Sequence, residues 1–162
     1  MNLIKIDETT AEKLAPLIAD FRVTLRSYKG IDAEPDLAWA GEEVLEFLGK
    51  GYPVYAAEQD GELLGYIVCR IEEPCLWVEH LYVREPFRRQ GAASLLFRKA
   101  EELAEAMGDD TVYNFVHPNN EGMIAFLRAR GYTVLNMLEI RKPYTGEELK
   151  TTVHVNETAF DY

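Results

Sequence analysis

The chain has 162 residues, 48% of them hydrophobic and 11% aromatic, and its formal net charge is −11 at pH 7. This length and apolar content predict one domain with a substantial core and exclude an intrinsically disordered chain. The negative charge argues against a nucleic-acid-binding protein, since phosphate contacts require a basic surface. No apolar run approaches the roughly 20 residues of a membrane span. We therefore expect a cytoplasmic protein with neither nucleic acid nor membrane as a partner.

The first half of the chain predicts two helices and a meander of antiparallel strands. Residues 2–6 are typical of a short strand, and residues 9–28 and 36–48 of two helices. Asp60-Gly61 lies between two apolar runs and favours a type I′ hairpin turn. Residues 75–83 follow as a third antiparallel strand.

The second half alternates helices and strands after residue 91. Residues 111–116 and 132–142 are predicted as strands, with a helix at 119–130 between them. We therefore expect a single α/β domain over residues 1–162, with its core at about 2–142. The tail, residues 143–162, has one strand-like stretch at 151–155. That tail either packs on the chain's own sheet or contacts a second subunit in a homodimer.

A basic loop stands out in this acidic chain, between strand 75–83 and a helix that starts near Gly91. It carries Arg84, Arg88 and Arg89. The first turn of a helix exposes unpaired N–H groups and the positive end of the helix dipole. Because Gly91 and the two alanines after it have minimal side chains, an anion can approach that backbone closely. The pattern predicts a site for a pyrophosphate or similar anion. It is neither a P-loop nor a Gly-x-Gly-x-x-Gly dinucleotide motif.

The stretch RRQGAA, residues 88–93, resembles the Arg/Gln-x-x-Gly-x-Gly/Ala signature of the GCN5-related N-acetyltransferase superfamily. VEHLYV ahead of it resembles the family's fourth strand, and Asn120, Phe126, Leu127 and Gly131-Tyr132 resemble a second family pattern. The resemblance implies a mixed, mostly antiparallel sheet of about six or seven strands flanked by about four helices, with splayed fourth and fifth strands. It also implies transfer of an acetyl group from acetyl-CoA to a primary amine of a small molecule or peptide.

By this resemblance, coenzyme A binds along strand 75–83 and the basic loop, with the pantetheine arm in the gap between the splayed strands. The implied cofactor-binding residues are Leu81, Tyr82, Val83, Arg88, Arg89, Gln90, Gly91, Ala92, Ala93, Ser94, Asn120 and Phe126. No metal site is expected, because Cys69 and Cys75 have no His or Cys companions at metal-ligand spacing.

Glu79 is the predicted general base, at a position where several family members carry a glutamate. Strand alternation puts Glu79, Leu81 and Val83 on one face, with His80 and Tyr82 on the other. A β-bulge would alter that register and make His80 the base instead. The alternative for Glu79 is a hydrogen-bonded strand carboxylate without a chemical role.

The proton donor for the leaving thiolate is not evident from the sequence. Where many family members carry a tyrosine, this chain has Leu127, so water or Tyr113 is the suggested substitute. This departure keeps a second class of function open, a non-catalytic acyl-CoA-binding sensor. His117 ends strand 111–116, and we expect it to be a polar loop residue and not a catalyst.

The amine acceptor is expected at the first two helices and their connecting loop. Tyr28, Asp32 and Trp39 lie there, and an acidic, aromatic rim would suit a cationic amine. The alternative is that this loop is polar only because loops face solvent.

Overall fold

The computed structural model describes the whole chain, residues 1–162, as two compact units, Met1–Phe126 and Leu127–Tyr162. The first unit is built on a five-stranded sheet in the order β1-β2-β3-β4-β5. Its strands are β1 (Asn2–Lys5), β2 (Val54–Gln59), β3 (Glu62–Glu72), β4 (Cys75–Val83) and β5 (Tyr113–Asn114). All neighbours are antiparallel except β4 and β5, which are parallel.

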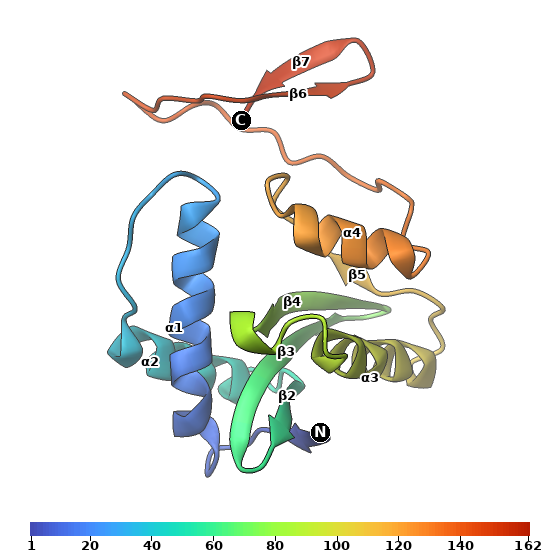
Figure 1. Cartoon of the computed structure of the whole chain (residues 1–162). Coiled ribbons are helices and arrows are strands. Elements are labelled where there is room, and N and C mark those ends of the chain that lie inside the picture. The colour runs from blue at the N-terminus through green and yellow to red at the C-terminus, as the bar shows by residue number, and fades with distance from the viewer. The chain divides into compact units, whose positions relative to one another are not determined.

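Helices cover both faces of this sheet (Figure 1). On one face lie α1 (Ala11–Ser27) and α2 (Leu37–Gly49), and on the other lies α3 (Ala92–Ala106). A fourth helix, α4 (Glu121–Ala129), follows β5. The predicted α/β class, the mixed and mostly antiparallel sheet and the four helices are confirmed, although this sheet has five strands and not about six or seven. β5 and α4 are also shorter than predicted.

Local signals in the sequence explain how several elements begin and end. The Asp36 side chain accepts the Trp39 N–H at 3.0 Å and so caps the start of α2. Between β2 and β3, Asp60 and Gly61 both have positive φ angles, 54° and 84°. Two successive positive φ values are those of a type I′ turn, so the predicted hairpin is confirmed.

A cluster of hydrogen-bonded polar side chains lies inside the core between the sheet and the first two helices. The Tyr66 hydroxyl and His80 Nδ1 are 3.0 Å apart, and His80 Nε2 lies 3.8 Å from Glu43 Oε1. The Arg22 guanidinium contacts both oxygens of the buried Glu43 carboxylate, with Nε 3.1 Å from Oε2. Because a buried charge needs a partner, this ion pair ties α1 to α2.

The second unit contains a hairpin of β6 (Thr152–Val155) and β7 (Thr158–Asp161), so the strand-like stretch of the tail is confirmed. The strand predicted over residues 132–142 is wrong. That segment pairs with no other strand, and its apolar side chains face solvent, Val134 being 85% and Ile140 65% exposed. Apolar β-forming residues favour a strand, but only backbone pairing makes one. None of the helices is both long and apolar enough to cross a membrane.

Candidate active site

The basic loop forms the connection from β4 to α3. A single 3₁₀ turn, Glu85–Phe87, follows the strand, and α3 begins after Gly91, which has φ 91°. The first intrahelical bond runs from Leu95 N–H to the Gly91 carbonyl, and no side chain caps the helix. The N–H groups of Ala92, Ala93 and Ser94 therefore point out of the helix end, as an anion site requires.

Side chains of the loop hold its backbone in place. Arg88 Nε donates to the Val83 carbonyl at 2.9 Å, and its guanidinium lies 5.8 Å from the centre of the Tyr82 ring. Gln90 Nε2 donates to the Pro86 carbonyl at 2.9 Å. Arg89 has a left-handed backbone, with φ 63°. An internally bonded loop that leads into an uncapped helix end has the geometry of an anion-binding loop, and we call residues 88–93 the candidate anion cradle.

A cavity lies where β4 and β5 part. The two strands pair only at Trp77–Tyr113 and Val78–Asn114, so the predicted splay is confirmed. Just beyond, a β-bulge interrupts the pairing of β4 with β3: Val68 faces His80 while Cys69 faces Val78, which leaves Glu79 as the extra residue. The cavity is lined by Phe21, Leu25, Val78, Glu79, Leu81, Asn114, Phe115, His117, Asn120 and Met123.

Glu79 thus reaches this cavity, with its side chain 34% exposed. Its carboxylate accepts a hydrogen bond from Arg70 Nε at 3.0 Å. Arg70 also pairs with Glu72, and its guanidinium lies 5.6 Å from the centre of the Trp77 ring. The candidate base is therefore held by an arginine that is itself fixed by two further contacts.

His80, the other candidate base, points into the core and is only 4% exposed. Burial, together with the nearby positive charge of Arg22, lowers its pKa from 6.5 to about 3. The bulge on which this alternative depended is present, but His80 is not among the residues that line the cavity.

Two amides face the same space. Asn114 Nδ2 donates to the Val112 carbonyl, whereas its Oδ1 is buried without a hydrogen-bond partner and is available to a ligand N–H. Asn120 Oδ1 accepts the Met123 N–H at 3.1 Å and so caps α4. Asn114 was missed because a strand asparagine carries no sequence signal until its surroundings are known.

The other predicted residues lie outside the lining of this cavity. Phe126 packs edge to face on Phe97 of α3, with ring centres 5.5 Å apart. Tyr113 lies against Trp77, and the nearby Cys75 side chain raises its pKa. Of the acceptor candidates, Tyr28 does not line the cavity itself but stacks on His117, which does. The exposed Asp32 and Trp39 are not among the lining residues, and Trp39 lies over Arg22.

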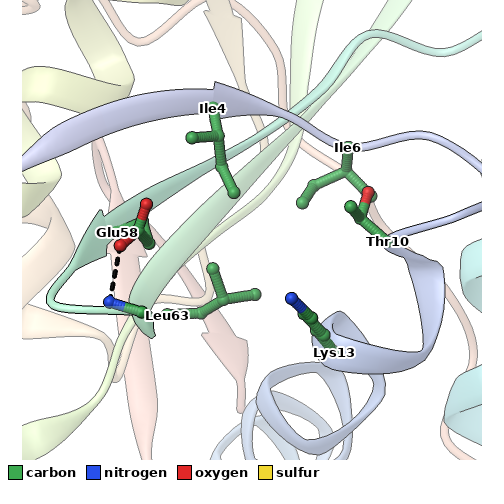
Figure 2. A pocket seen from close by; sticks show the side chains of 7 residues that line it. Ile4, Ile6, Thr10, Lys13, Glu58 and Leu63 are labelled. Atoms are coloured by element: carbon green, nitrogen blue, oxygen red, sulfur yellow. Dashed lines mark hydrogen bonds between the residues drawn. The ribbon is translucent and has the colours of Figure 1, made fainter.

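A second hollow lies between β1, α1 and the β2–β3 hairpin (Figure 2). Ile4, Ile6 and Leu63 make it largely aliphatic. Its one carboxylate, Glu58, accepts the Gly61 N–H at 2.7 Å and so serves the hairpin turn (Figure 2). This lining offers no acid–base arrangement, and we place the candidate active site in the cavity between β4 and β5.

A scan against family models matches residues 18–132 to the acetyltransferase (GNAT) family. The chain belongs to the acetyltransferase (GNAT) family. This confirms the resemblance and the predicted enzyme class. No curated protein matches the sequence.

Solved structures of the same fold include several acetyltransferases. Aminoglycoside antibiotic 6'-N-acetyltransferase AAC(6')-IG from Acinetobacter haemolyticus is 19% identical, with 89% of this chain and 99% of that chain covered and a TM-score of 0.68. The ribosomal-protein-alanine N-acetyltransferase from Brucella melitensis biovar Abortus 2308 is 18% identical, with 88% and 99% covered and a TM-score of 0.70. AAC(6')-Iy, in complex with a CoA-linked bisubstrate analogue, is 16% identical, with 88% and 97% covered and a TM-score of 0.67.

Proposed function

We propose that this GNAT protein transfers an acetyl group from acetyl-CoA to a primary amine of a small molecule or peptide. The observation that carries the proposal is the position of two features on β4. An uncapped helix start follows the strand, after the basic loop 88–91, and a cavity with an accessible carboxylate opens beside the strand's bulge. AAC(6')-Iy was crystallised with CoA and with a CoA conjugate, which supports the same cofactor here.

The residues present fit coenzyme A. The outward N–H groups at the start of α3 and the guanidinium groups of Arg88 and Arg89 suit a pyrophosphate. The buried, unpaired Asn114 Oδ1 suits an amide N–H of the pantetheine arm. When bound, acetyl-CoA supplies an activated thioester carbonyl.

Glu79 is proposed to accept the proton that the amine loses, directly or through one water molecule. A carboxylate that lines the cavity and is held by Arg70 is preorganised for that role. The thiolate of coenzyme A is then protonated by water. Leu127 cannot donate a proton, and Tyr113 does not line the cavity.

For the acceptor we propose a cationic amine. Proteins of similar fold include an aminoglycoside antibiotic acetyltransferase and a ribosomal-protein-alanine acetyltransferase. The strong negative charge of this chain favours an approaching cation. Tyr28, which stacks on the lining residue His117, is the best supported of the acceptor-binding candidates.

The deciding experiment is release of free CoA thiol from acetyl-CoA near pH 8, across polyamines, aminoglycosides, amino acids and peptides. We expect amine-dependent release that Glu79→Gln abolishes, with acetyl-CoA binding retained. Binding of acetyl-CoA without turnover on any amine would favour the alternative function, a non-catalytic sensor, which Leu127 keeps open.

A further inference from the structure

The cavity between β4 and β5 has a mostly apolar lining around a single carboxylate. Glu79 is the only acidic residue that lines it. The apolar side chains come from α1, β4, the end of β5 and α4, and they are those of Phe21, Leu25, Val78, Leu81, Phe115 and Met123. A positively charged group therefore has one carboxylate partner here, and whatever carries that group meets apolar side chains.

Phe115 contributes an aromatic ring that is fixed on one side and open on the other. It lines the cavity and is nonetheless 62% exposed. Its ring stacks on Trp77 of β4, with centres 4.6 Å apart and planes 14° apart. Trp77 is itself held by Tyr113, at 4.9 Å between ring centres, and by the guanidinium of Arg70. An exposed ring held in this way can stack on a further ring.

This aromatic ring and the candidate base belong to one site. Arg70 Nε bonds the Glu79 carboxylate, and the same guanidinium lies 5.6 Å from the centre of the Trp77 ring. One arginine thus fixes both the carboxylate and the indole on which Phe115 stacks. An amine whose nitrogen reaches Glu79 brings its carbon body against Phe115, since both residues line the same cavity. A polycation would require further carboxylates, and this lining offers none.

Resting on the acetyl-transfer function proposed above, we propose that the acceptor is a singly charged amine carried on an aromatic ring, and that Phe115 selects it. The ring of the acceptor stacks on the exposed face of Phe115, and its ammonium group pairs with Glu79. Phe21 and Met123 suit the same ring, because aromatic side chains and thioethers both contact rings favourably. Trp77 is a positioning residue that holds Phe115.

The test compares amines that differ in one property at a time. 2-Phenylethylamine and octylamine have the same number of carbon atoms and a single charge, but only the first has a ring. Spermidine has several charges and no ring. We expect kcat/KM for 2-phenylethylamine to exceed that for octylamine roughly fivefold, as an aromatic pair allows beyond its buried area. The preference over spermidine should be larger still.

Phe115→Leu keeps an apolar side chain and removes the ring. It should abolish the preference for 2-phenylethylamine over octylamine through KM for the amine, while kcat and KM for acetyl-CoA stay near the wild-type values. A merely structural defect in β5 would instead lower turnover of both amines alike. Tyr55→Leu is the matched control, because Tyr55 is an aromatic residue of β2 that lies beside Lys99 and does not line the cavity. It should keep the wild-type preference.

A second readout does not depend on turnover. Calorimetry of the same amines on protein saturated with CoA should give the same order of affinities, and Phe115→Leu should lose the advantage of the ring. The inference is overturned if 2-phenylethylamine is not preferred, if Phe115→Leu keeps the preference, or if CoA displaces 2-phenylethylamine, which would assign the ring of Phe115 to the pantetheine arm. A wild type that turns over no amine would instead overturn the proposed function, while calorimetry would still judge the selection by Phe115.

Discussion

Arg70 holds the carboxylate of Glu79 through a 3.0 Å hydrogen bond from its Nε. The same guanidinium pairs with Glu72 and lies over Trp77, so the arginine joins β3 to the bulged part of β4. A base must lie within reach of the proton it removes, and a displacement of about 1 Å can cost a hundredfold in rate. The orientation of Glu79 thus depends on a residue that does not line the cavity.

Replacing Arg70 with Gln should lower kcat roughly tenfold or more, because the Glu79 carboxylate loses the contact that orients it. The KM for acetyl-CoA should stay near the wild-type value, since the anion cradle lies on another element. Glu72→Gln is the matched control: it removes the other partner of Arg70 and keeps the Arg70–Glu79 bond. Equal losses in both variants would mean that Arg70 acts on the sheet and not on Glu79.

Gly91 should be required for coenzyme A binding. Its φ of 91° is strained for any residue with a Cβ, although the space around it is open. We expect Gly91→Ala to weaken acetyl-CoA binding about tenfold in calorimetry, since roughly 1 kcal/mol of strain is relieved by moving the loop. Gly91→Asp should bind more weakly still, because its carboxylate repels the pyrophosphate.

Gly51→Ala controls for the backbone strain, since Gly51 also has a positive φ, 72°, and open space, but lies in the turn after α2. It should lose stability to a similar extent while its acetyl-CoA affinity stays unchanged. Wild-type affinity in Gly91→Asp would contradict the position of the anion site.

Gly65 permits the close approach of β3 to the end of β4. A Cβ there would lie 2.5 Å from the Tyr82 carbonyl oxygen and 2.8 Å from Val83 Cγ2. Gly65→Ala should therefore lower the free energy of unfolding by roughly 1–3 kcal/mol, as overpacking does. Gly41→Ala, in the open middle of α2, should instead stabilise the protein by about 0.5–1 kcal/mol. Urea unfolding measures both free-energy changes. If Gly65→Ala left stability unchanged, β3 and the end of β4 could move apart at no cost, and the close approach would not be required.

His80 should make the protein sensitive to acid. Its pKa is about 3 in the folded protein and 6.5 for an unperturbed histidine, so the unfolded state binds more protons between these values. Stability is then full above about pH 6.5 and falls with decreasing pH by roughly 1.4 kcal/mol per unit. The Glu43–Arg22 ion pair lies beside His80 in the same core and is kept in the variant below.

His80→Asn isolates this contribution, because Asn has no titrating group and can still form a hydrogen bond with the Tyr66 hydroxyl. Urea unfolding between pH 7 and pH 4 should show a shallower slope for this variant than for the wild type. The exposed His154→Asn variant should keep the wild-type slope. A His80→Asn slope as steep as that of the wild type would assign the acid sensitivity to other groups.

Features that are determined by consecutive residues could be predicted from the sequence. The loop geometry at 88–93, the hairpin at Asp60-Gly61 and the cap at Asp36 each depend on near neighbours, whereas anion binding by that loop stays a prediction. Features that depend on residues distant in the chain could not be predicted from the sequence. The stacking of His117 on Tyr28, for example, depends on a residue at the end of α1. The apolar run 132–142 resembles a strand, and nothing in its own residues reveals whether another strand pairs with it.

The bulge in β4 is an intermediate case. Alternation put Glu79 and Leu81 on one face, and both do line the cavity, but the extra residue brings Val78 there too. A bulge leaves little trace in composition, because it depends on the register of the neighbouring strand.

Because β5 is short, its local stability should be lower than that of the central strands of the sheet. β3 pairs with β2 over residues 62–68 and with β4 over residues 65–72, whereas β5 is held at one edge by two residue pairs. Backbone amides with so few partners open without global unfolding. In hydrogen exchange, β3 amides should therefore report unfolding of the whole unit, while β5 amides exchange early. We therefore expect the cavity wall that carries Asn114 to open locally more often than the wall formed by β4.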